Sequence, residues 1–391
     1  MTPQARVQAA IEVLDLVIAA ARGQGASADR IVSEWFRSRR FAGSGDRRAV
    51  RELVYAAIRV CGEVPGSGRA AMLLLAKDDP ALSALFDGSR HAPAPLGADE
   101  AIASPGIAPD WLGQRLAASG IAGEAAKALL GRAPLDVRIN RLKAGDLQLP
   151  EPGEPTQAPD ALRFAAGTPV EQWPAFRAGL IEVQDSGSQL ACLAVEAEPG
   201  ETVVDLCAGA GGKTLALAAA MRGRGRLIAC DTDRARLSRL APRAERAGAV
   251  LIETRLLDPN REAAALGDLT GKCDAVLVDA PCSGTGTWRR NPEARWRLSE
   301  AELARYTAIQ ARLLDLAARM VRPGGRLVFV TCSLLDAEGA DQAAGFLARN
   351  PDWRADCPEL GSGTPRGQGL RLDPHRDGTD GFFIARFVSP W

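Results

Sequence analysis

Two cysteines in matching sequence surroundings are the first residues whose types and spacing could do chemistry. Cys282 follows the apolar run Ala275–Val278 within the stretch DAPCSG, and Cys332 follows Arg326–Val330 within the stretch TCS. A cysteine thiolate is a strong nucleophile, and covalent catalysis divides one difficult step into easier ones. One cysteine at the end of a strand is more often inert packing. Two that follow separate predicted strands indicate a shared catalytic crevice.

A loop of small residues follows another apolar segment, Val203–Leu206, and precedes a predicted helix. Small residues let the backbone approach a ligand closely, and the start of a helix offers free N–H groups. The pattern therefore predicts a nucleotide-like ligand. The GKT at 212–214 does not make a phosphate-binding P-loop, because position 207 holds cysteine where that motif needs glycine. The loop residues that we expect to bind the ligand are Cys207, Ala208, Gly209, Ala210, Gly211, Gly212 and Lys213.

Three aspartates occupy positions that suit this ligand and a reacting base. Asp231 ends the next predicted strand, where a carboxylate can accept hydrogen bonds from both ribose hydroxyls. Asp258 follows the third predicted strand and could hold an adenine amino group. Asp279 lies three residues before Cys282 and could contact the edge of a reacting base, where it would stabilise developing charge.

The elements that must position these residues alternate between strand and helix. Such alternation builds βαβ units and a mostly parallel sheet, whose ligands bind at the carboxyl ends of the strands. The predicted strands are 203–206, 226–230, 249–253, 275–278 and 326–330, and the predicted helices are 215–221, 234–247 and 299–320.

The earlier part of the chain has a different character. Apolar residues at helical spacing predict helices at 6–21, 31–36 and 48–60 within a mostly helical segment. Alternating residues at 135–142 and short apolar runs at 162–164 and 181–183 predict strands around a loop at 149–159. We therefore expect a helical domain at 1–130, a small α+β subdomain at 131–190 and the strand–helix domain at 191–391.

Composition limits the classes of protein and site without selecting one. The chain has 391 residues, with 48 basic and 48 acidic side chains, so total charge does not identify a nucleic-acid binder. Local basic patches exist at 37–51 and at 289–297; each is either a solvated surface or an RNA contact. Trp288 and Trp296, within the second patch, could stack on bases, pack in the core or form part of a lid. Eight cysteines without a CxxC pair and two histidines predict no metal site. No signal peptide or membrane-length apolar run appears, so we expect a cytoplasmic monomer with free thiols and no membrane contact.

Together these motifs resemble the Nol/Nop/Sun family of RNA cytosine-5 methyltransferases, over residues 130–391. The two cysteine motifs in this order are highly specific to the family. The matching pieces are VQD at 183–185 with Ser188 and Gln189, DLCAGAGGKT at 205–214, Asp231, Asp258, DAPCSGTGTWRRNPE at 279–293, TCS at 331–333 and DGFFIARF at 380–387.

The resemblance implies a fold, a cofactor and a set of roles. It implies a class I Rossmann-like domain with a mostly parallel seven-stranded sheet and S-adenosylmethionine bound by residues 207–213, Asp231, Asp258 and Asp279. Cys332 would add to carbon 6 of cytosine so that carbon 5 can attack the methyl group, and Cys282 would help release the product. Lys213 would reach towards the base. Spacing alone leaves the two thiol roles open, since DNA cytosine-5 methyltransferases use the Pro-Cys thiol as nucleophile.

The sequence departs from the family pattern in places, and it leaves other hypotheses about function open. Ala210 stands where the family usually has proline, and the helical segment only faintly resembles the NusB-like RNA-binding extension of ribosomal members. Ribosomal RNA is the expected substrate, with transfer RNA as the alternative. An amino-group methyltransferase would need an aromatic residue in place of Cys282, and no segment after 300 reads as a DNA-recognition domain. A non-catalytic RNA-binding assembly factor would not need both thiols.

Overall fold

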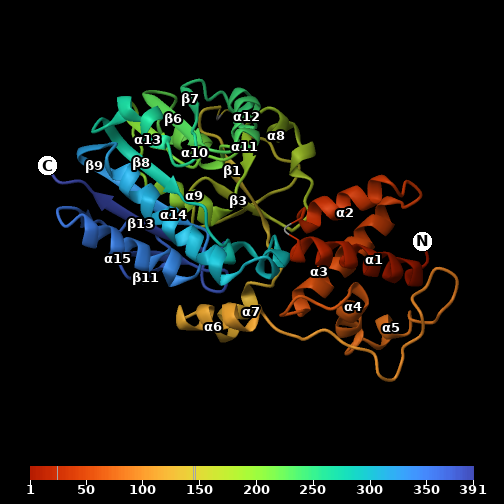
Figure 1. The fold of residues 1–391 in the computed structure, drawn as a ribbon. Helices are drawn as coiled ribbons and strands as arrows, with labels where there is room; N and C mark the ends of the chain where they lie inside the picture. Colours follow the sequence, from red (N-terminus) through yellow and green to blue (C-terminus); the bar gives the residue numbers. More distant parts are fainter. Residues whose placement is uncertain (24, 144, 146) are drawn as a thin grey trace. The chain divides into compact units, whose positions relative to one another are not determined.

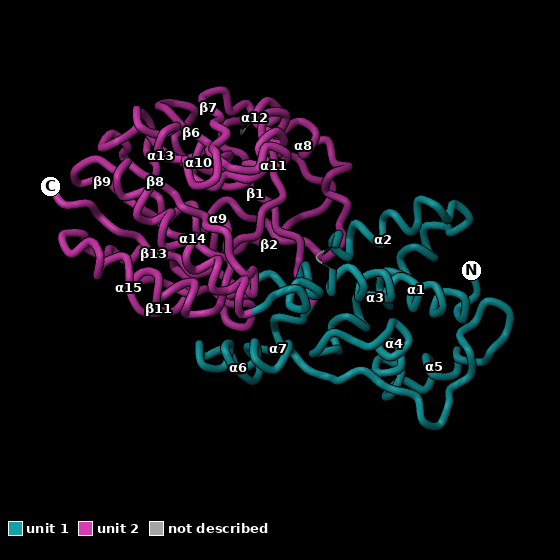
Figure 2. Tube along the Cα trace, viewed as in Figure 1, with its two compact units in different colours: residues 1–131, 287–299 teal, residues 132–286, 300–391 magenta. Residues whose placement is uncertain are grey.

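The computed structural model describes residues 1–23, 25–143, 145 and 147–391, and it divides into two compact units. Unit 1 contains residues 1–131 together with 287–299, and unit 2 contains residues 132–286 and 300–391 (Figure 2). The chain therefore passes from unit 2 to unit 1 and back again shortly after Cys282. Each unit is described separately below.

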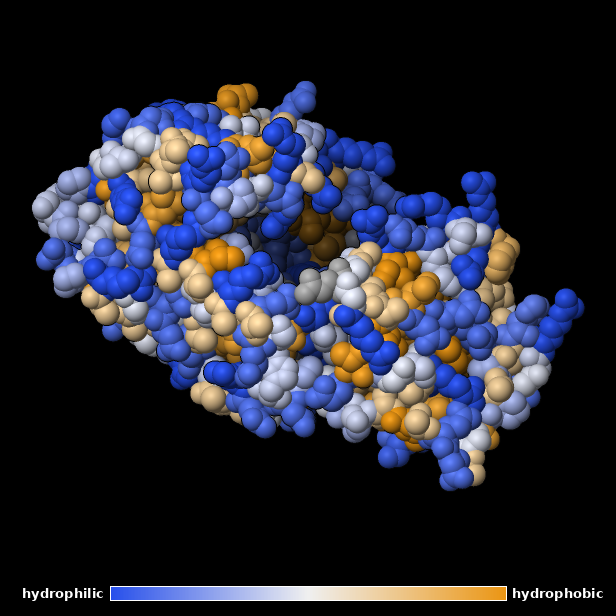
Figure 3. All heavy atoms as spheres, viewed as in Figure 1, coloured by the Kyte–Doolittle hydropathy of each residue, from blue (hydrophilic) through white to orange (hydrophobic). Residues whose placement is uncertain are grey.

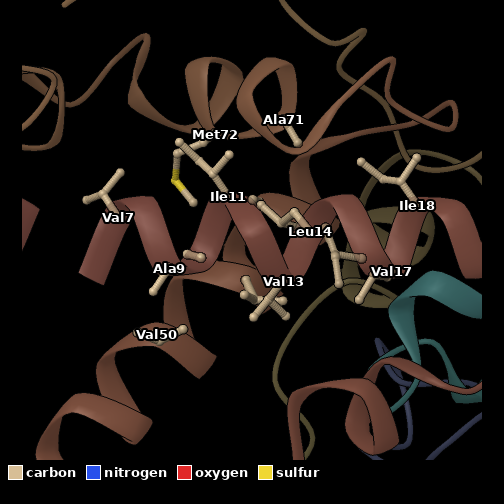
Figure 4. Packing of buried hydrophobic residues seen from close by; sticks show 14 of the residues in the cluster. Val7, Ala9, Ile11, Val13, Leu14, Val17, Ile18, Val50, Ala71 and Met72 are labelled. Carbon is tan, nitrogen blue, oxygen red and sulfur yellow. The ribbon is translucent and has the colours of Figure 1, made fainter. Parts of the chain in front are cut away.

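Unit 1 is built around its first helix, α1 (Pro3–Arg22). Figure 4 shows why this helix is apolar on more than one side: Val7, Ile11 and Ile18 face one way, with Met72 nearby, while Ala9 and Val13 face Val50. A helix that is buried on several faces belongs to the middle of a bundle. The other helices of this unit are α2 (Ala28–Arg37), α3 (Ser44–Val60), α4 (Gly68–Ala76), α5 (Pro80–Ser83), α6 (Asp110–Ala118) and α7 (Gly123–Ala128).

The segment 287–299 completes this bundle, and its basic and aromatic residues are mostly buried there. Trp288 and Arg295 are fully buried, and Trp296 is 6% exposed within the core that α1 to α4 form. Arg295 donates hydrogen bonds to the carbonyls of Ile58 at 2.6 Å and Cys61 at 2.7 Å. The hypothesis that the patch at 288–297 contacts RNA is therefore wrong for these three side chains, which pack inside the protein instead.

Unit 2 begins with a small antiparallel sheet in the order β2-β3-β1-β4. Its strands are β1 (Leu135–Ile139), β2 (Glu154–Pro155), β3 (Ala161–Phe164) and β4 (Ile181–Val183). Val137, Phe164, Trp173 and Ile181 form a separate apolar core beneath it. Two short helical segments, η1 (Val170–Gln172) and α8 (Pro174–Arg177), contribute to that core.

The main sheet of unit 2 follows the order β11-β12-β13-β9-β8-β5-β6-β7, with β10 paired to β13 (Figure 1). Strands β7, β6, β5, β8 and β9 pair in parallel, and β13 joins β9 antiparallel. The chain order reverses between β5 and β8, which is where open sheets of this kind bind ligands. The strands are β5 (Thr202–Asp205), β6 (Arg226–Asp231), β7 (Ile252–Leu256), β8 (Cys273–Asp279), β9 (Val321–Thr331), β10 (Arg354–Ala355), β11 (Thr364–Arg366), β12 (Gly369–Leu372) and β13 (Phe382–Val388).

Helices cover both faces of this sheet, because its inner strands carry buried apolar residues on both faces. Val203 and Leu277 pack with α9 (Ser186–Leu193), α10 (Gly212–Ala220) and α12 (Leu240–Ala247) on one face. Val204 and Val278 pack on the other face with α13 (Glu262–Ala265), α14 (Glu300–Ala318) and α15 (Ala340–Arg349). The remaining short helices of the chain are α11 (Arg234–Leu237), η2 (Gly267–Leu269), η3 (Thr285–Thr287), η4 (Pro292–Trp296) and η5 (Asp336–Glu338), of which η4 belongs to unit 1.

The structure confirms the α/β architecture and departs from the sequence-based expectation in detail. The main sheet has nine strands rather than seven, because short strands near the end of the chain extend its antiparallel edge. Strand β7 begins at Ile252 rather than 249, since Gly248 ends α12 in a left-handed conformation and the chain needs a turn before it extends. The predicted loop at 149–159 contains the two-residue strand β2. Residues 132–190 share a compact unit with the main sheet.

Polar and charged side chains cover most of the face drawn in Figure 3, with apolar residues scattered among them. Among the described residues, no helix has both the length and the apolar character needed to span a membrane.

Candidate active site

The small-residue loop after β5 forms a cradle whose shape depends on glycine. Gly209 and Gly211 adopt the left-handed conformation, with φ of 55° and 85°. A Cβ on Gly211 would lie 2.0 Å from Cδ1 of Leu240, so only glycine fits there. The loop then enters α10, whose first N–H groups face the carboxyl end of the sheet. These features fit an adenosyl ligand that must approach the backbone closely.

A Gly211→Ala variant is expected to lose about 2–4 kcal/mol of unfolding free energy, from left-handed strain and the clash with Leu240. Gly212→Ala is the matched control, because its Cβ would meet nothing within 4 Å. Urea denaturation of the ligand-free variants measures both effects. Equal stability of the two variants would contradict this account of the loop.

Asp231 ends β6 beside this cradle. One of its carboxylate oxygens accepts from the Gly209 N–H at 2.7 Å, and the other accepts from the Asp233 N–H at 2.7 Å. Each carboxylate oxygen has a second lone pair that can accept from a ribose hydroxyl. Asp258 is exposed just beyond β7, and its neighbour Leu257 donates a backbone bond to the Asp231 carbonyl. The structure therefore places both predicted carboxylates at the same end of the sheet.

Lys213 and Asp279 form an ion pair, with Nζ 2.7 Å from Oδ2. Their side chains are 11% and 29% exposed, so the pair is shielded but reachable. Although burial opposes the charge, the Asp279 carboxylate raises the pKa of Lys213, with Cys192 and Cys332 contributing in the same direction. Lys213 therefore remains a cation, and its ammonium group interacts electrostatically with Cys332.

The two cysteines lie against each other. Cys282 Sγ and Cys332 Sγ are 3.4 Å apart, and both residues are partly exposed. Backbone bonds join the two loops, from Ala280 to Val330 at 2.9 Å and from Gly286 to Cys332 at 3.0 Å. The structure thus brings together, at the ends of β8 and β9, the thiols that the sequence places fifty residues apart.

Sequence reasoning missed a buried carboxyl group beneath the cradle. Asp205 is fully buried and accepts from the Thr214 hydroxyl at 2.7 Å, and its Oδ1 has no hydrogen-bond partner among the residues that the structure describes. Burial raises the pKa of Asp205 to about 7; Asp279 adds to this, while the Thr214 bond opposes it. The position of Asp205 at the end of a predicted strand is the sequence feature that could have pointed to it.

The free energy of unfolding is expected to depend on pH through the titration of Asp205. Because the folded-state pKa lies above the unfolded one, the stabilising contribution is complete below about pH 4 and is lost as pH rises through about 7. The Asp205→Asn variant cannot titrate there. Its unfolding free energy relative to wild type should rise by about 2 kcal/mol between pH 5 and pH 8. Urea denaturation at both pH values checks this, and a constant difference would contradict it.

The VQD and SQ pieces form a joint between the two sheets of unit 2 rather than a reactive site. Asp185 begins α9 and accepts from the Gly187 N–H at 2.9 Å, and Gln189 donates to the Gln184 carbonyl at 3.0 Å. Arg138 on β1 donates to the Gln184 side chain at 2.8 Å. These bonds fix α9, whose Cys192 lies close to Lys213.

A mixed sheet with this order of five parallel strands, a glycine cradle after β5 and carboxylates at the ends of β6 and β8 define a class I S-adenosylmethionine-dependent methyltransferase. Among the described residues no cluster of histidine, cysteine or carboxylate side chains could hold a metal ion.

Comparison with known proteins identifies the family. The sequence profile described as "16S rRNA methyltransferase RsmB/F" matches residues 192–388. The chain is 37% identical over 306 residues to ribosomal RNA small subunit methyltransferase B of Xylella fastidiosa, covering 74% of this chain and 70% of that protein. The chain therefore belongs to the RsmB/F methyltransferase family, and its cofactor is S-adenosylmethionine.

Solved structures agree with this assignment. The crystal structure of PH0851 matches with a TM-score of 0.76 and 25% identity, covering 99% of both chains. A methyltransferase homologue from Pyrococcus horikoshii matches with a TM-score of 0.58 and 26% identity, covering 72% of this chain and 99% of that one.

Proposed function

We propose that this chain methylates carbon 5 of a cytosine in small-subunit ribosomal RNA, with Cys332 as the covalent nucleophile and Cys282 as the residue that assists release. The observation that carries the proposal is the pair of thiols 3.4 Å apart beside the Lys213–Asp279 ion pair. The Xylella fastidiosa relative is named as a methyltransferase of small-subunit ribosomal RNA, which supports this choice of substrate.

The proposed chemistry uses each thiol once. Carbon 5 of cytosine is a poor nucleophile until the Cys332 thiolate adds to carbon 6, which makes the ring an enamine. Bound S-adenosylmethionine supplies the methyl group on a sulfonium centre. A base then removes the proton from carbon 5, its C–H electrons re-form the ring double bond, and the bond from carbon 6 to Cys332 breaks. Cys282, whose Sγ lies 3.4 Å from that of Cys332, is proposed to assist this last step by donating its proton to the departing Cys332 sulfur.

The residues around the thiols suit a base that has left its stack. Asp279 can accept from the exocyclic amino group of cytosine while Lys213 holds that carboxylate in place. The proposed cofactor contacts are the loop 207–213 and the carboxylates of Asp231 and Asp258. Exposed arginines on α2 and near α3, among them Arg37 and Arg40, are proposed to contact RNA phosphates.

Product analysis tests this function. The purified protein would be incubated with S-adenosylmethionine and unmodified 16S ribosomal RNA, assembled small subunits or transfer RNA, and the digested nucleosides identified by mass spectrometry. We expect 5-methylcytidine from ribosomal RNA and none from transfer RNA. Methylation of transfer RNA alone, or of the exocyclic nitrogen, would overturn the proposal.

A further inference from the structure

A buried glutamate holds the turn that follows Cys282. Glu338 ends η5 and is fully buried. Its Oε1 accepts from the Ser283 N–H at 2.8 Å and from the Gln310 amide at 3.1 Å, and its Oε2 accepts from the Ser283 hydroxyl. In the part of the chain that the structure describes, none of these partners is a cation.

The same turn is tied down from two further directions. Gln310 on α14 also donates to the Pro281 carbonyl at 2.9 Å, so a single amide joins Glu338 to the residue before Cys282. Ser283 contacts the hydroxyl of Ser333 at 3.2 Å, next to the other cysteine. The carboxylate therefore contacts the residue after Cys282 directly and the residue before it through one intermediary.

The surroundings of the two thiols carry opposite charges. The Glu338 carboxylate faces the turn that carries Cys282, whereas the Lys213 ammonium interacts with Cys332. A hydrogen bond to Cys332 raises the pKa of the Cys282 thiol well above its usual range, and burial and Glu338 raise it further. The negative charge beside Cys282 favours a proton on that thiol.

We propose that Glu338 is a positioning residue that makes the two thiols unequal: its buried carboxylate fixes the turn after Cys282 and retains the proton of the pair on that thiol. Cys332 is thereby left as the nucleophile. The inference rests on the proposed function for the reaction that this inequality serves. It also supplies a reason for the assignment of the two thiols, which their spacing in the sequence leaves open.

Selective alkylation tests the inference without RNA. Ligand-free protein would be treated with substoichiometric iodoacetamide, and the label on each cysteine quantified by peptide mass spectrometry. The exposed Cys357 serves as an internal reference for reagent concentration. Because the thiolate is the reacting form, we expect wild type to react faster at Cys332 than at Cys282. Glu338→Gln removes the charge but keeps the shape, and should raise the Cys282 rate relative to Cys357 by about tenfold.

Two variants make the result unambiguous. Glu151→Gln removes an exposed carboxylate from the same unit and should leave all rates unchanged. If Glu338→Gln fails to bind S-adenosylmethionine or unfolds, Glu338→Asp retains the charge at a shorter reach and should raise the Cys282 rate by a smaller factor. An unchanged Cys282 rate in the folded Glu338 variant, or a wild type that reacts faster at Cys282, would overturn the inference.

The proposed function and this inference can fail separately. If the alkylation rates shift as expected but no protein–RNA adduct or 5-methylcytidine forms, the inequality of the thiols stands and the proposed function is wrong. If methylation proceeds and the rates do not respond to Glu338, the proposed function stands and the role of Glu338 is wrong.

Discussion

A Cys282→Ala variant is expected to accumulate a covalent protein–RNA adduct that survives a denaturing gel, whereas Cys332→Ala should form none. The first variant can still form the bond to carbon 6 and transfer the methyl group, but release is slow without the second thiol. The second variant lacks the nucleophile, and its turnover should fall by about 10⁴-fold or more. The measurement uses unmodified ribosomal RNA, S-adenosylmethionine and quantification of the shifted protein band.

The exposed Cys357 provides the control for these variants. Cys357→Ala should turn over like wild type and leave no adduct, because this exposed thiol is not one of the two in the Cys282–Cys332 pair. An adduct that forms with Cys332→Ala but not with Cys282→Ala would exchange the two roles. Absence of any adduct, with S-adenosylmethionine binding intact, would exclude the covalent mechanism for the RNA tested.

An Arg295→Met variant is expected to destabilise unit 1 by about 3–5 kcal/mol, because it removes a buried guanidinium that donates hydrogen bonds to several carbonyls in the core. The Arg295 guanidinium bonds to the carbonyls of Ile58, Cys61 and Pro292. Burial lowers the pKa of Arg295 to about 10, so the group stays charged at neutral pH. Hydrogen–deuterium exchange of the α3 amides measures the loss, and they should exchange faster in the variant.

Arg37→Met is the control for this experiment, since Arg37 is exposed at the end of α2 in the same unit. It should leave exchange in α3 unchanged. Equal protection of α3 in wild type and Arg295→Met would mean that segment 287–299 contributes little to the bundle.

The strands and loops of residues 191–391 could be predicted because the sequence features that indicate them are local. Strands such as β5 and β8 are continuous apolar runs, as expected for strands buried on both faces, and the cradle and both cysteines follow directly from strand ends. Gly211 and the alternation of strand and helix predict the proposed cofactor position without any long-range information. The resemblance to a family added the roles of the thiols, which no spacing rule supplies.

Other features depend on contacts between distant segments, and local patterns cannot reveal them. Arg295 and Trp296 have the composition of a nucleic-acid contact, yet they are buried against helices more than two hundred residues earlier in the chain. Glu338 reads as one more acidic residue before a helix, and its role emerges only when Ser283 and Gln310 approach it. The unpaired oxygen of Asp205 is likewise a product of packing.

Residues 287–299 belong to the helical unit although they lie within the sequence of the other unit. This affects how such a protein can be truncated or recombined with its relatives. A gene fragment cut at residue 131 would leave Trp296 without the helices that bury it, and the free helical fragment would lack part of its interior. Chimaeras between relatives would have to exchange both stretches together. A mutation in either stretch is therefore expected to be compensated in the other, so that covariation between them would record their shared history.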